Sequence, residues 1–235
     1  MKWILIKDKA NDGITNMSID KSLLSYVQKT KTPVIRFYKW NPGTVSVGLY
    51  ESLKDVNENF CRENNIAIVR RPTGGKAVYH DRSDFTYSVA APLSIFDNDL
   101  KKSYMEICSW IISALKELGI NACLANTNDI IVNGKKISGN SANVKKGILL
   151  QHGTLIYSLD KKRMAEIFNV GEDLIDKKVT SVLGNKKVSW NEVYDSLLRN
   201  FTKGKEIHET YLNLEKVEIR NSKNLSARGN CYTHW

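Results

Sequence analysis

The sequence contains few cysteines and prolines, the residues that cross-link a chain or interrupt its regular structure. It holds 4 cysteines and 4 prolines in 235 residues, and no two cysteines form a C-x-x-C pair. That spacing offers neither a zinc ligand set nor a redox dithiol, so we expect free thiols. No apolar run approaches the roughly 20 residues of a membrane-spanning helix. The short apolar stretch of MKWILIKDKA reads as a first strand, not as a signal peptide. The sequence thus predicts a cytoplasmic protein without a membrane partner.

The two common nucleotide-binding loops are also missing, because neither G-x-G-x-x-G nor G-x-x-x-x-G-K-[ST] occurs. The chain does carry surplus positive charge, with 35 Lys and Arg against 25 Asp and Glu and a formal net charge of +10. This surplus favours an anionic partner, such as nucleic acid, a nucleotide or an acidic protein. The lysines are scattered, and no zinc finger, arginine-rich arm or aromatic-basic RNA motif accompanies them. Nucleic acid is therefore not the expected partner.

Hydrophobic patterning predicts both strands and helices. The strand segments are WILIKD, VIRFYKW, TVSVGLY, AIVRRP, FTYSVAAP, DIIVNGKKIS and ILLQHGTLIYSL. Asn133-Gly134 marks a type I′ hairpin turn, because both turn positions need a positive φ. Amphipathic helices are predicted over 104–118 and 190–201, the second opened by Ser189 and Glu192 at capping-box spacing. Shorter helices are predicted over 17–28, 55–64, 161–168 and 205–213.

Hairpins outnumber β-α-β alternations in this pattern. We therefore predict an α+β fold, in which helices flank a mixed, largely antiparallel sheet. The sequence contains no internal repeat and no linker rich in Pro, Gly or Ser. A single domain over residues 1–235 is the expectation.

The stretch RRPTGGKAVYHD, residues 70–81, places two arginines beside a glycine pair. Arginine offers a planar fork of charged donors, and glycines let the backbone approach a ligand closely. The stretch is a candidate phosphate cradle. The alternative is a plain strand-turn-strand with surface arginines.

Two more stretches carry polar residues on predicted strands. In NDIIVNGKKISGNSA, alternation predicts Lys136 and Ser138 on one face and Lys135 and Ile137 on the other. A lysine in a pocket can stabilise negative charge that develops on an activated acyl group; the alternative is a solvated hairpin tip. In LLQHGTLIYSL, His152 and Thr154 share one face. They either line a pocket, or His152 is a hydrogen-bonded core residue.

Together these stretches resemble the lipoate-protein ligase A family, part of the biotin/lipoate ligase superfamily. The similarity rests on RRPTGGKAVYHD, NDIIVNGKKISGNSA, HGTLIYSL and KVTSVLG in that order, and RFYKWNPGTVSVG is similar to an early strand pair of the family. The resemblance spans about residues 3 to 201. It implies the catalytic-domain fold of biotin/lipoate ligases, which is similar to that of class II synthetases.

The resemblance also implies an activity. Lipoate and ATP, with Mg²⁺, would form lipoyl-AMP, and a lysine of an apo lipoyl domain or of the glycine-cleavage H protein would accept the lipoyl group. Lys136 would be catalytic, and Asp129 would hold Mg²⁺ or the adenylate. The residues implied for binding ATP and the adenylate are Arg71, Thr73, Gly74, Gly75, Lys76, Ala77, Val78, Tyr79, Asn128, Asp129, Lys136, Ser138, His152, Gly153 and Thr154.

The chain departs from the family pattern in three places. Lys76 stands where the family has a third glycine, so we expect the shape of the channel to differ. Ser138-Gly139-Asn140-Ser141-Ala142 has one residue more than the SGSA motif, so we expect a different loop after Lys136. The chain also ends near the point where long ligases continue into an accessory domain. A separate accessory subunit is therefore an expected partner.

Two other functions stay open. A cysteine-dependent octanoyltransferase, which takes octanoate from an acyl carrier protein through a thioester, is similar to the chain at RRPTGGKAVYHD. Its nucleophile would be Cys123, although the Pro-Ser-x-Tyr-Glu approach to the hairpin is absent and the spacing to the hairpin is about two residues short. The ND pair favours the ligase. The third possibility is a non-catalytic module that binds an acyl group or a nucleotide.

Overall fold

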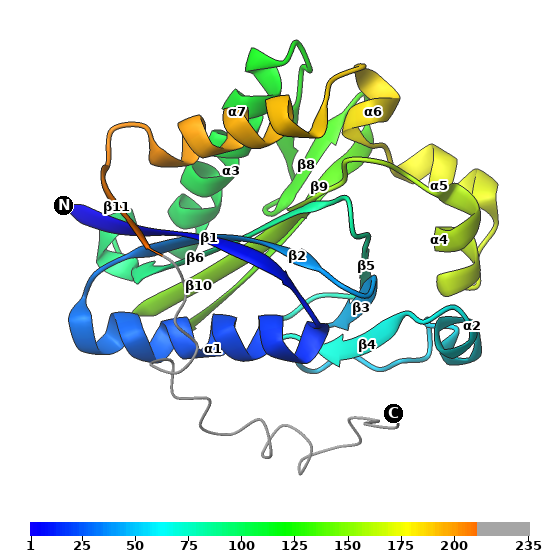
Figure 1. The fold of residues 1–235 in the computed structure, drawn as a ribbon, viewed down its shortest axis with the longest axis horizontal. Coiled ribbons are helices and arrows are strands. Elements are labelled where there is room, and N and C mark those ends of the chain that lie inside the picture. The colour runs from blue at the N-terminus through cyan, green and yellow to red at the C-terminus, as the bar shows by residue number, and fades with distance from the viewer. Residues whose placement is uncertain (211–235) are drawn as a thin grey trace.

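Eight strands form the main sheet of the computed structural model, which describes residues 1–210 (Figure 1). Their order is β11-β1-β2-β6-β10-β9-β8-β7. The pairs of β1 with β2 and with β11 are parallel, and the other pairs are antiparallel. The predicted mixed, largely antiparallel sheet flanked by helices is confirmed. The strands are β1 (Lys2–Asn11), β2 (Val34–Trp40), β6 (Phe85–Pro92), β7 (Cys123–Ala125), β8 (Asp129–Val132), β9 (Lys135–Lys145), β10 (Ile148–Leu155) and β11 (Glu206–Thr210).

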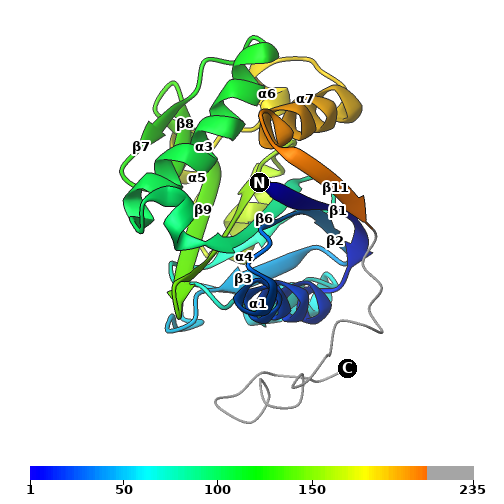
Figure 2. The ribbon, with the colours of Figure 1, turned by 90° about the vertical axis from the view of Figure 1, so that its left-hand side faces the viewer.

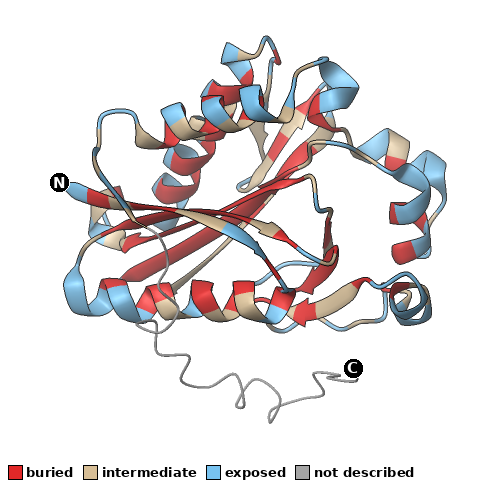
Figure 3. Cartoon of the chain, viewed as in Figure 1, coloured by how far each residue is buried: buried red, intermediate tan, exposed pale blue. Residues whose placement is uncertain are grey.

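Helices cover both faces of this sheet (Figure 2). On one face lie α3 (Leu100–Glu117) and α7 (Trp190–Thr202), and on the other lies α1 (Gly13–Thr30). Along β10 the side chains alternate between two cores: Leu149 packs beneath α3 and α7, whereas Ile148 and Leu150 pack against α1. β10 is buried along its whole length (Figure 3), but only Ile148–Leu150 form an unbroken apolar run, and the buried polar residues Gln151, His152 and Thr154 follow.

A second sheet has three strands in the order β4-β3-β5 and lies at one end of the main sheet (Figure 1). Its strands are β3 (Thr44–Val47), β4 (Ala67–Arg70) and β5 (Val78–His80). The remaining helices are α2 (Glu58–Glu63), η1 (Leu93–Phe96), α4 (Lys161–Ile167), α5 (Glu172–Lys178) and α6 (Val182–Asn185). No helix within residues 1–210 is long and apolar enough to cross a bilayer.

Most of the predicted local structure is confirmed. Asn133 and Gly134 have φ values of 49° and 77° in the hairpin between β8 and β9. Ser189 and Glu192 form the capping box of α7. The expected rearranged loop after Lys136 is wrong, because β9 continues through Asn140 and pairs with β10 without a register shift.

The helix predicted over 205–213 is also wrong. Residues Glu206–Thr210 form β11, which pairs in parallel with β1, and 211–213 lie outside the described residues. Ile207 packs on the core beneath α7, while Glu209 forms an ion pair with Lys7 at 2.9 Å. Without β11, the edge of β1 would keep unpaired backbone groups. This pairing outweighs the weak helical preference of the segment.

Candidate active site

The predicted residues meet at a cavity of about 150 Å³ between the small sheet and the main sheet. Its apolar side is formed by residues such as Tyr38, Trp40 and Val78, and its polar side by β9 and β10. Within residues 1–210, no aspartate or glutamate lines the cavity, whereas three cations do: Arg71, Lys76 and Lys136. The other lining residues are Met17, Ser46, Gly75, Ala77, His80, Thr86, Asn128, Gly139, Asn140, Ser141, His152, Gly153 and Thr154.

The two arginines of RRPTGG hold backbone. Arg70 Nη1 donates to the carbonyl oxygens of Gly48 and Glu51, at 2.6 and 2.8 Å. Arg71 is buried, and its Nε, Nη1 and Nη2 atoms donate to the carbonyls of Gly74, Ser46 and Lys76. Burial lowers the pKa of Arg71 to about 10. Arg70 therefore holds the segment that follows β3, whereas Arg71 shapes the glycine turn and has no N–H group left for a phosphate.

The glycine turn needs its second glycine. Gly75 has a φ of 91°, a conformation that L side chains rarely adopt. A Cβ there would also lie 2.9 Å from Arg71 Nη2. Ser141 on β9 donates to the carbonyl of Gly74 at 2.9 Å, so the turn is fastened to the main sheet as well.

Lys136 lies on the cavity side of β9. Its Nζ atom is 2.7 Å from Asp129 Oδ1, and the two side chains are 38% and 26% exposed. The KVTSVLG motif supports this position, because Thr180 N donates to the carbonyl of Lys136 at 2.9 Å. Gly139 leaves room for the ammonium, since a Cβ at that position would lie 2.8 Å from Nζ.

Ser138 does not share the face of Lys136, contrary to the alternation. A register shift between β8 and β9 pairs Ile130 with Ser138 but Ile131 with Lys136, so Ile137 is an extra residue on β9. Ile137 and Ser138 are both fully buried, and Ser138 Oγ has no hydrogen-bond partner in the described part of the chain. The bulge thus aims Lys136 at the cavity and removes Ser138 from it.

His152 belongs both to the cavity wall and to a buried hydrogen-bond chain. Its Nδ1 atom lies 2.9 Å from Asp20 Oδ2, and its Nε2 atom lies 2.7 Å from Thr73 Oγ1. Asp20 is fully buried and also accepts hydrogen bonds from Arg36, Tyr38 and Ser88. Burial acts to raise the pKa of Asp20, but the hydrogen bond with His152, the charges of Arg36 and His152, and the hydrogen bond from Ser88 together hold this pKa below its usual value. The chain connects α1 through β10 to the glycine turn.

Thr154 forms a similar link. His80 Nδ1 lies 2.9 Å from Thr154 Oγ1, and His80 Nε2 lies 2.7 Å from Ser46 Oγ. Burial, together with Arg71 and His152, lowers the pKa of His80, so this imidazole is neutral. Trp40 stacks on it with ring centroids 4.4 Å apart.

The other predicted residues divide into lining and supporting positions. Ala77, Val78 and Gly153 line the cavity, as does Asn128, whose Nδ2 donates to the carbonyl of Asn140 at 2.6 Å. Tyr79 instead packs away from the cavity, against the core beside α2 and α4, while Thr73 and Gly74 only support the turn.

Sequence patterns missed several residues of the wall. Tyr38 and Trp40 line the cavity from β2, and Asp20 of α1 supports it through His152; the segment RFYKWNPGTVSVG was recognised, but no role was predicted for any of the three residues. His80 lies in the stretch RRPTGGKAVYHD, but it was not predicted to belong to the site. Its position directly after a short apolar segment was the one sequence feature that could have indicated it.

Cys123 is the exposed thiol among the cysteines that the structure describes. Cys61 and Cys108 are buried, and burial raises their pKa values to about 11 and about 12. Cys231 lies outside the described residues. Cys123 pairs with Ile131, which pairs with Lys136, so these residues form one row across β7, β8 and β9. Residues paired in this way point to the same face, which places Cys123 on the side of Lys136.

The row of paired residues sets the distance between Cys123 and Lys136. With neighbouring strands about 4.8 Å apart, the Cα atoms of Cys123 and Lys136 are separated by roughly 10 Å. The neighbouring Leu124 points to the opposite face, where it packs on the core with Ile130. The thiol therefore stands at the sheet edge, beside the cavity and outside it.

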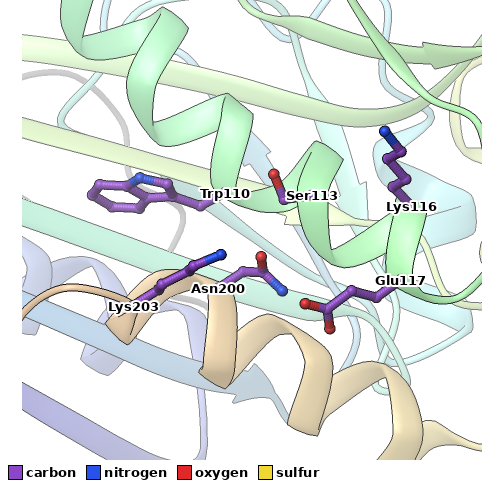
Figure 4. A pocket seen from close by; sticks show the side chains of 6 residues that line it. All are labelled: Trp110, Ser113, Lys116, Glu117, Asn200 and Lys203. Atoms are coloured by element: carbon purple, nitrogen blue, oxygen red, sulfur yellow. The ribbon is translucent and has the colours of Figure 1, made fainter.

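A more open hollow of about 440 Å³ lies between α3 and α7 (Figure 4). It contains none of the predicted residues. Glu117 there accepts hydrogen bonds from Ser196 and Arg199. Its six lining residues are Trp110, Ser113, Lys116, Glu117, Asn200 and Lys203.

Asp129 does not fit the expected magnesium site. Its carboxylate is already paired with the Lys136 ammonium, and residues 1–210 contain no group of three His, Cys, Asp or Glu side chains arranged to hold a metal. A hard divalent cation needs several oxygen ligands, of which this one carboxylate supplies too few.

Comparison with known proteins places this geometry in context. The profile of the lipoyl protein ligase A/B catalytic domain matches residues 12–202. The octanoyltransferase LipM of Staphylococcus aureus is 27% identical over 96% of this chain and 95% of its own. LipM of Bacillus subtilis is 30% identical over 82% of this chain and 79% of its own. A bi-partite lipoate protein ligase from Thermoplasma acidophilum superposes with a TM-score of 0.83 and 24% identity, covering 93% of this chain and 90% of that one. At this identity, the superposition establishes the fold only.

These relatives correct the expected activity. The curated relatives from Staphylococcus aureus, Halalkalibacterium halodurans and Bacillus subtilis are all named octanoyltransferase LipM, not ligase. The predicted ATP-dependent lipoate ligase activity is therefore wrong. The predicted cofactors ATP and Mg²⁺ and the predicted substrate lipoate are wrong for the same reason. The Asn128-Asp129 pair led to the wrong prediction because both side chains have structural partners. Asn128 bonds to Asn140 and Asp129 pairs with Lys136, and these contacts do not depend on the acyl donor.

Proposed function

Because the chain belongs to the lipoyl protein ligase A/B catalytic domain family, we propose that it is an octanoyltransferase of protein lipoylation. It takes an octanoyl group from the thioester of an acyl carrier protein and passes it to a lysine of an apo lipoyl domain or of the glycine-cleavage H protein. The single observation that carries the mechanism is the position of Cys123, an exposed thiol on the cavity face of the sheet, in one row with Lys136.

In the first step the Cys123 thiolate attacks the thioester carbonyl. A new C–S bond forms, the old one breaks, and the carrier sulfur leaves as a thiolate, which takes up the proton that the Cys123 thiol gave up when it ionised. In the second step the neutral amine of the acceptor lysine attacks the Cys123 thioester. The C–N bond forms, the C–S bond breaks, and the amine proton returns to the thiol. Each step exchanges one acyl bond for another, so no ATP is consumed.

Lys136 is assigned to the charge that develops on the carbonyl oxygen. Asp129 holds its ammonium at 2.7 Å, and a fixed cation stabilises an oxyanion without reorganising during the reaction. The acyl chain would extend over Ile131 from Cys123, and its tail would lie along Tyr38, Trp40 and Val78. We assign the other predicted residues that line the cavity, apart from Lys76, to this acyl site, and Thr73 and Gly74 to the turn that encloses it.

The proposed reaction also bears on the predicted domain, location and accessory subunit of the chain. The uninterrupted match over residues 12–202 supports one catalytic domain, 1–235. Free thiols fit a cytoplasmic setting. An accessory subunit was expected for adenylation, a step that the proposed reaction does not contain.

The test uses the whole protein with octanoyl-acyl carrier protein and no ATP. Intact mass spectrometry should show one octanoyl group on the enzyme, removable by hydroxylamine, and then on an added apo lipoyl domain. Cys123→Ser should prevent both, and Cys231→Ser is the control thiol variant that should prevent neither. Acceptor modification that requires ATP, or that survives Cys123→Ser, would contradict the proposal.

A further inference from the structure

Of the cations among residues 1–210 that line the cavity, one is not used by the fold. Arg71 donates from all three nitrogens to the backbone, and Lys136 is paired with Asp129. The side chain of Lys76 has neither a hydrogen bond nor an ion pair with the residues that the structure describes. Because no carboxylate of the described part of the chain lines the cavity, the Lys76 ammonium has no acidic partner among those residues.

The backbone beneath Lys76 is nevertheless held in place. Its carbonyl accepts from Arg71 Nη2 at 2.8 Å. Two residues earlier, the Gly74 carbonyl accepts from Arg71 Nη2 at 2.6 Å and from Ser141 Oγ at 2.9 Å. An exposed ammonium thus rises from a fixed point on the cavity rim, which limits the ordering entropy that binding would cost.

We propose that Lys76 binds the phosphate of the phosphopantetheine arm of the thioester donor. The inference rests on the proposed octanoyltransferase reaction. With the acyl tail in the cavity, the arm beyond the sulfur must leave across the rim, and its phosphodiester is the anion that every such donor carries. A lysine ammonium binds phosphate as a compact point charge. The guanidinium of Arg71, which could form paired hydrogen bonds, is already bonded to backbone carbonyls.

The experiment compares donors that differ only in the arm. Octanoyl-phosphopantetheine and octanoyl-pantetheine share the acyl group and the thioester, but the second lacks the phosphate. The measured quantity is KM for acylation of Cys123. Lys76→Ala should raise KM for the phosphorylated donor roughly tenfold, as expected for one charge-assisted hydrogen bond at an open site, and leave the other donor unchanged. Lys76→Arg should restore the preference, and Lys116→Ala, an exposed lysine in the hollow of Figure 4, should behave as wild type.

Equal losses for both donors, or no loss for either, would overturn the inference. A loss confined to the donor on the whole carrier protein would also overturn it, because Lys76 would then contact the carrier's own carboxylates. A direct measurement keeps the two proposals separate. Phosphopantetheine should bind the Cys123→Ser protein more tightly than pantetheine does, and this difference should vanish in Cys123→Ser/Lys76→Ala. Failed turnover with intact discrimination in binding would count against the reaction and leave the phosphate site standing.

Discussion

Gly139→Ala should separate the position of the Lys136 ammonium from the stability of the fold. Gly139 follows the β9 bulge and is not among the glycines with positive φ, so its backbone accepts alanine. The added Cβ would lie 2.7 Å from Lys136 Cε and 2.8 Å from Nζ. These are the far atoms of a flexible side chain, which can swing aside. The ammonium should therefore leave its position beside Asp129 while the sheet stays intact.

The two expected magnitudes differ widely. Losing a half-exposed ion pair costs about 0–1 kcal/mol of unfolding free energy, and replacing a glycine at a permitted φ returns about 0.4–1 kcal/mol. The net change in stability should stay within about 1 kcal/mol. Removing a fixed donor from an oxyanion typically lowers kcat about 10²–10³-fold. A displaced ammonium still stabilises the oxyanion in part, so we expect kcat of Gly139→Ala to decrease roughly 10–100-fold.

Two measurements test this. The rate of Cys123 acylation at saturating octanoyl-acyl carrier protein reports the ammonium, and urea unfolding reports the fold. Gly171→Ala is the matched control, because a Cβ there meets nothing within 4 Å. Wild-type acylation in Gly139→Ala would refute the role of the Lys136 position. A loss of activity accompanied by an equal loss of folded protein would refute the reasoning from sterics.

Three further outcomes are expected. Iodoacetamide should modify Cys123 before Cys61 and Cys108 at pH 8, because burial raises the pKa values of these two thiols to about 11 and about 12; peptide mapping that finds either of them labelled as early as Cys123 would contradict their burial. Burial also raises the pKa of Asp84 to about 8, against the opposing N–H donors of Asp81 and Tyr157. The folded state then holds a proton that the unfolded chain has lost, so the free energy of unfolding should fall as pH rises from about 4 to 8, a slope that Asp84→Asn should flatten. Finally, Asp20→Asn should cost about 3–5 kcal/mol in urea unfolding, because it leaves buried Arg36 without its fully buried carboxylate partner; a loss below 1 kcal/mol would show that the neighbouring Asp8 suffices.

Local features of the site were predictable from the sequence. The hairpin at Asn133-Gly134 needs positive φ at two adjacent positions, and that demand is visible in two letters. The shared face of His152 and Thr154 follows from a period of two along β10. The bulge at Ile137 was not visible, because an extra residue changes the pairing of a strand without changing its composition. The helix predicted over 205–213 failed for a similar reason, since the open edge of β1 lies about two hundred residues away in the chain.

The sequence by itself determined the elements, their mixed sheet and the motifs that lie around one cavity, because hydrophobic period and turn chemistry act over a few neighbouring residues. Only the tertiary structure decided which charges are free. It paired Arg71 with its own turn, Lys136 with Asp129 and His152 with Asp20, a partner 132 positions away, and it left Lys76 and Cys123 open. Hydrogen bonds and ion pairs of this kind join segments that approach only when the sheet has formed. The residues available for chemistry are therefore known only after those partners have been assigned.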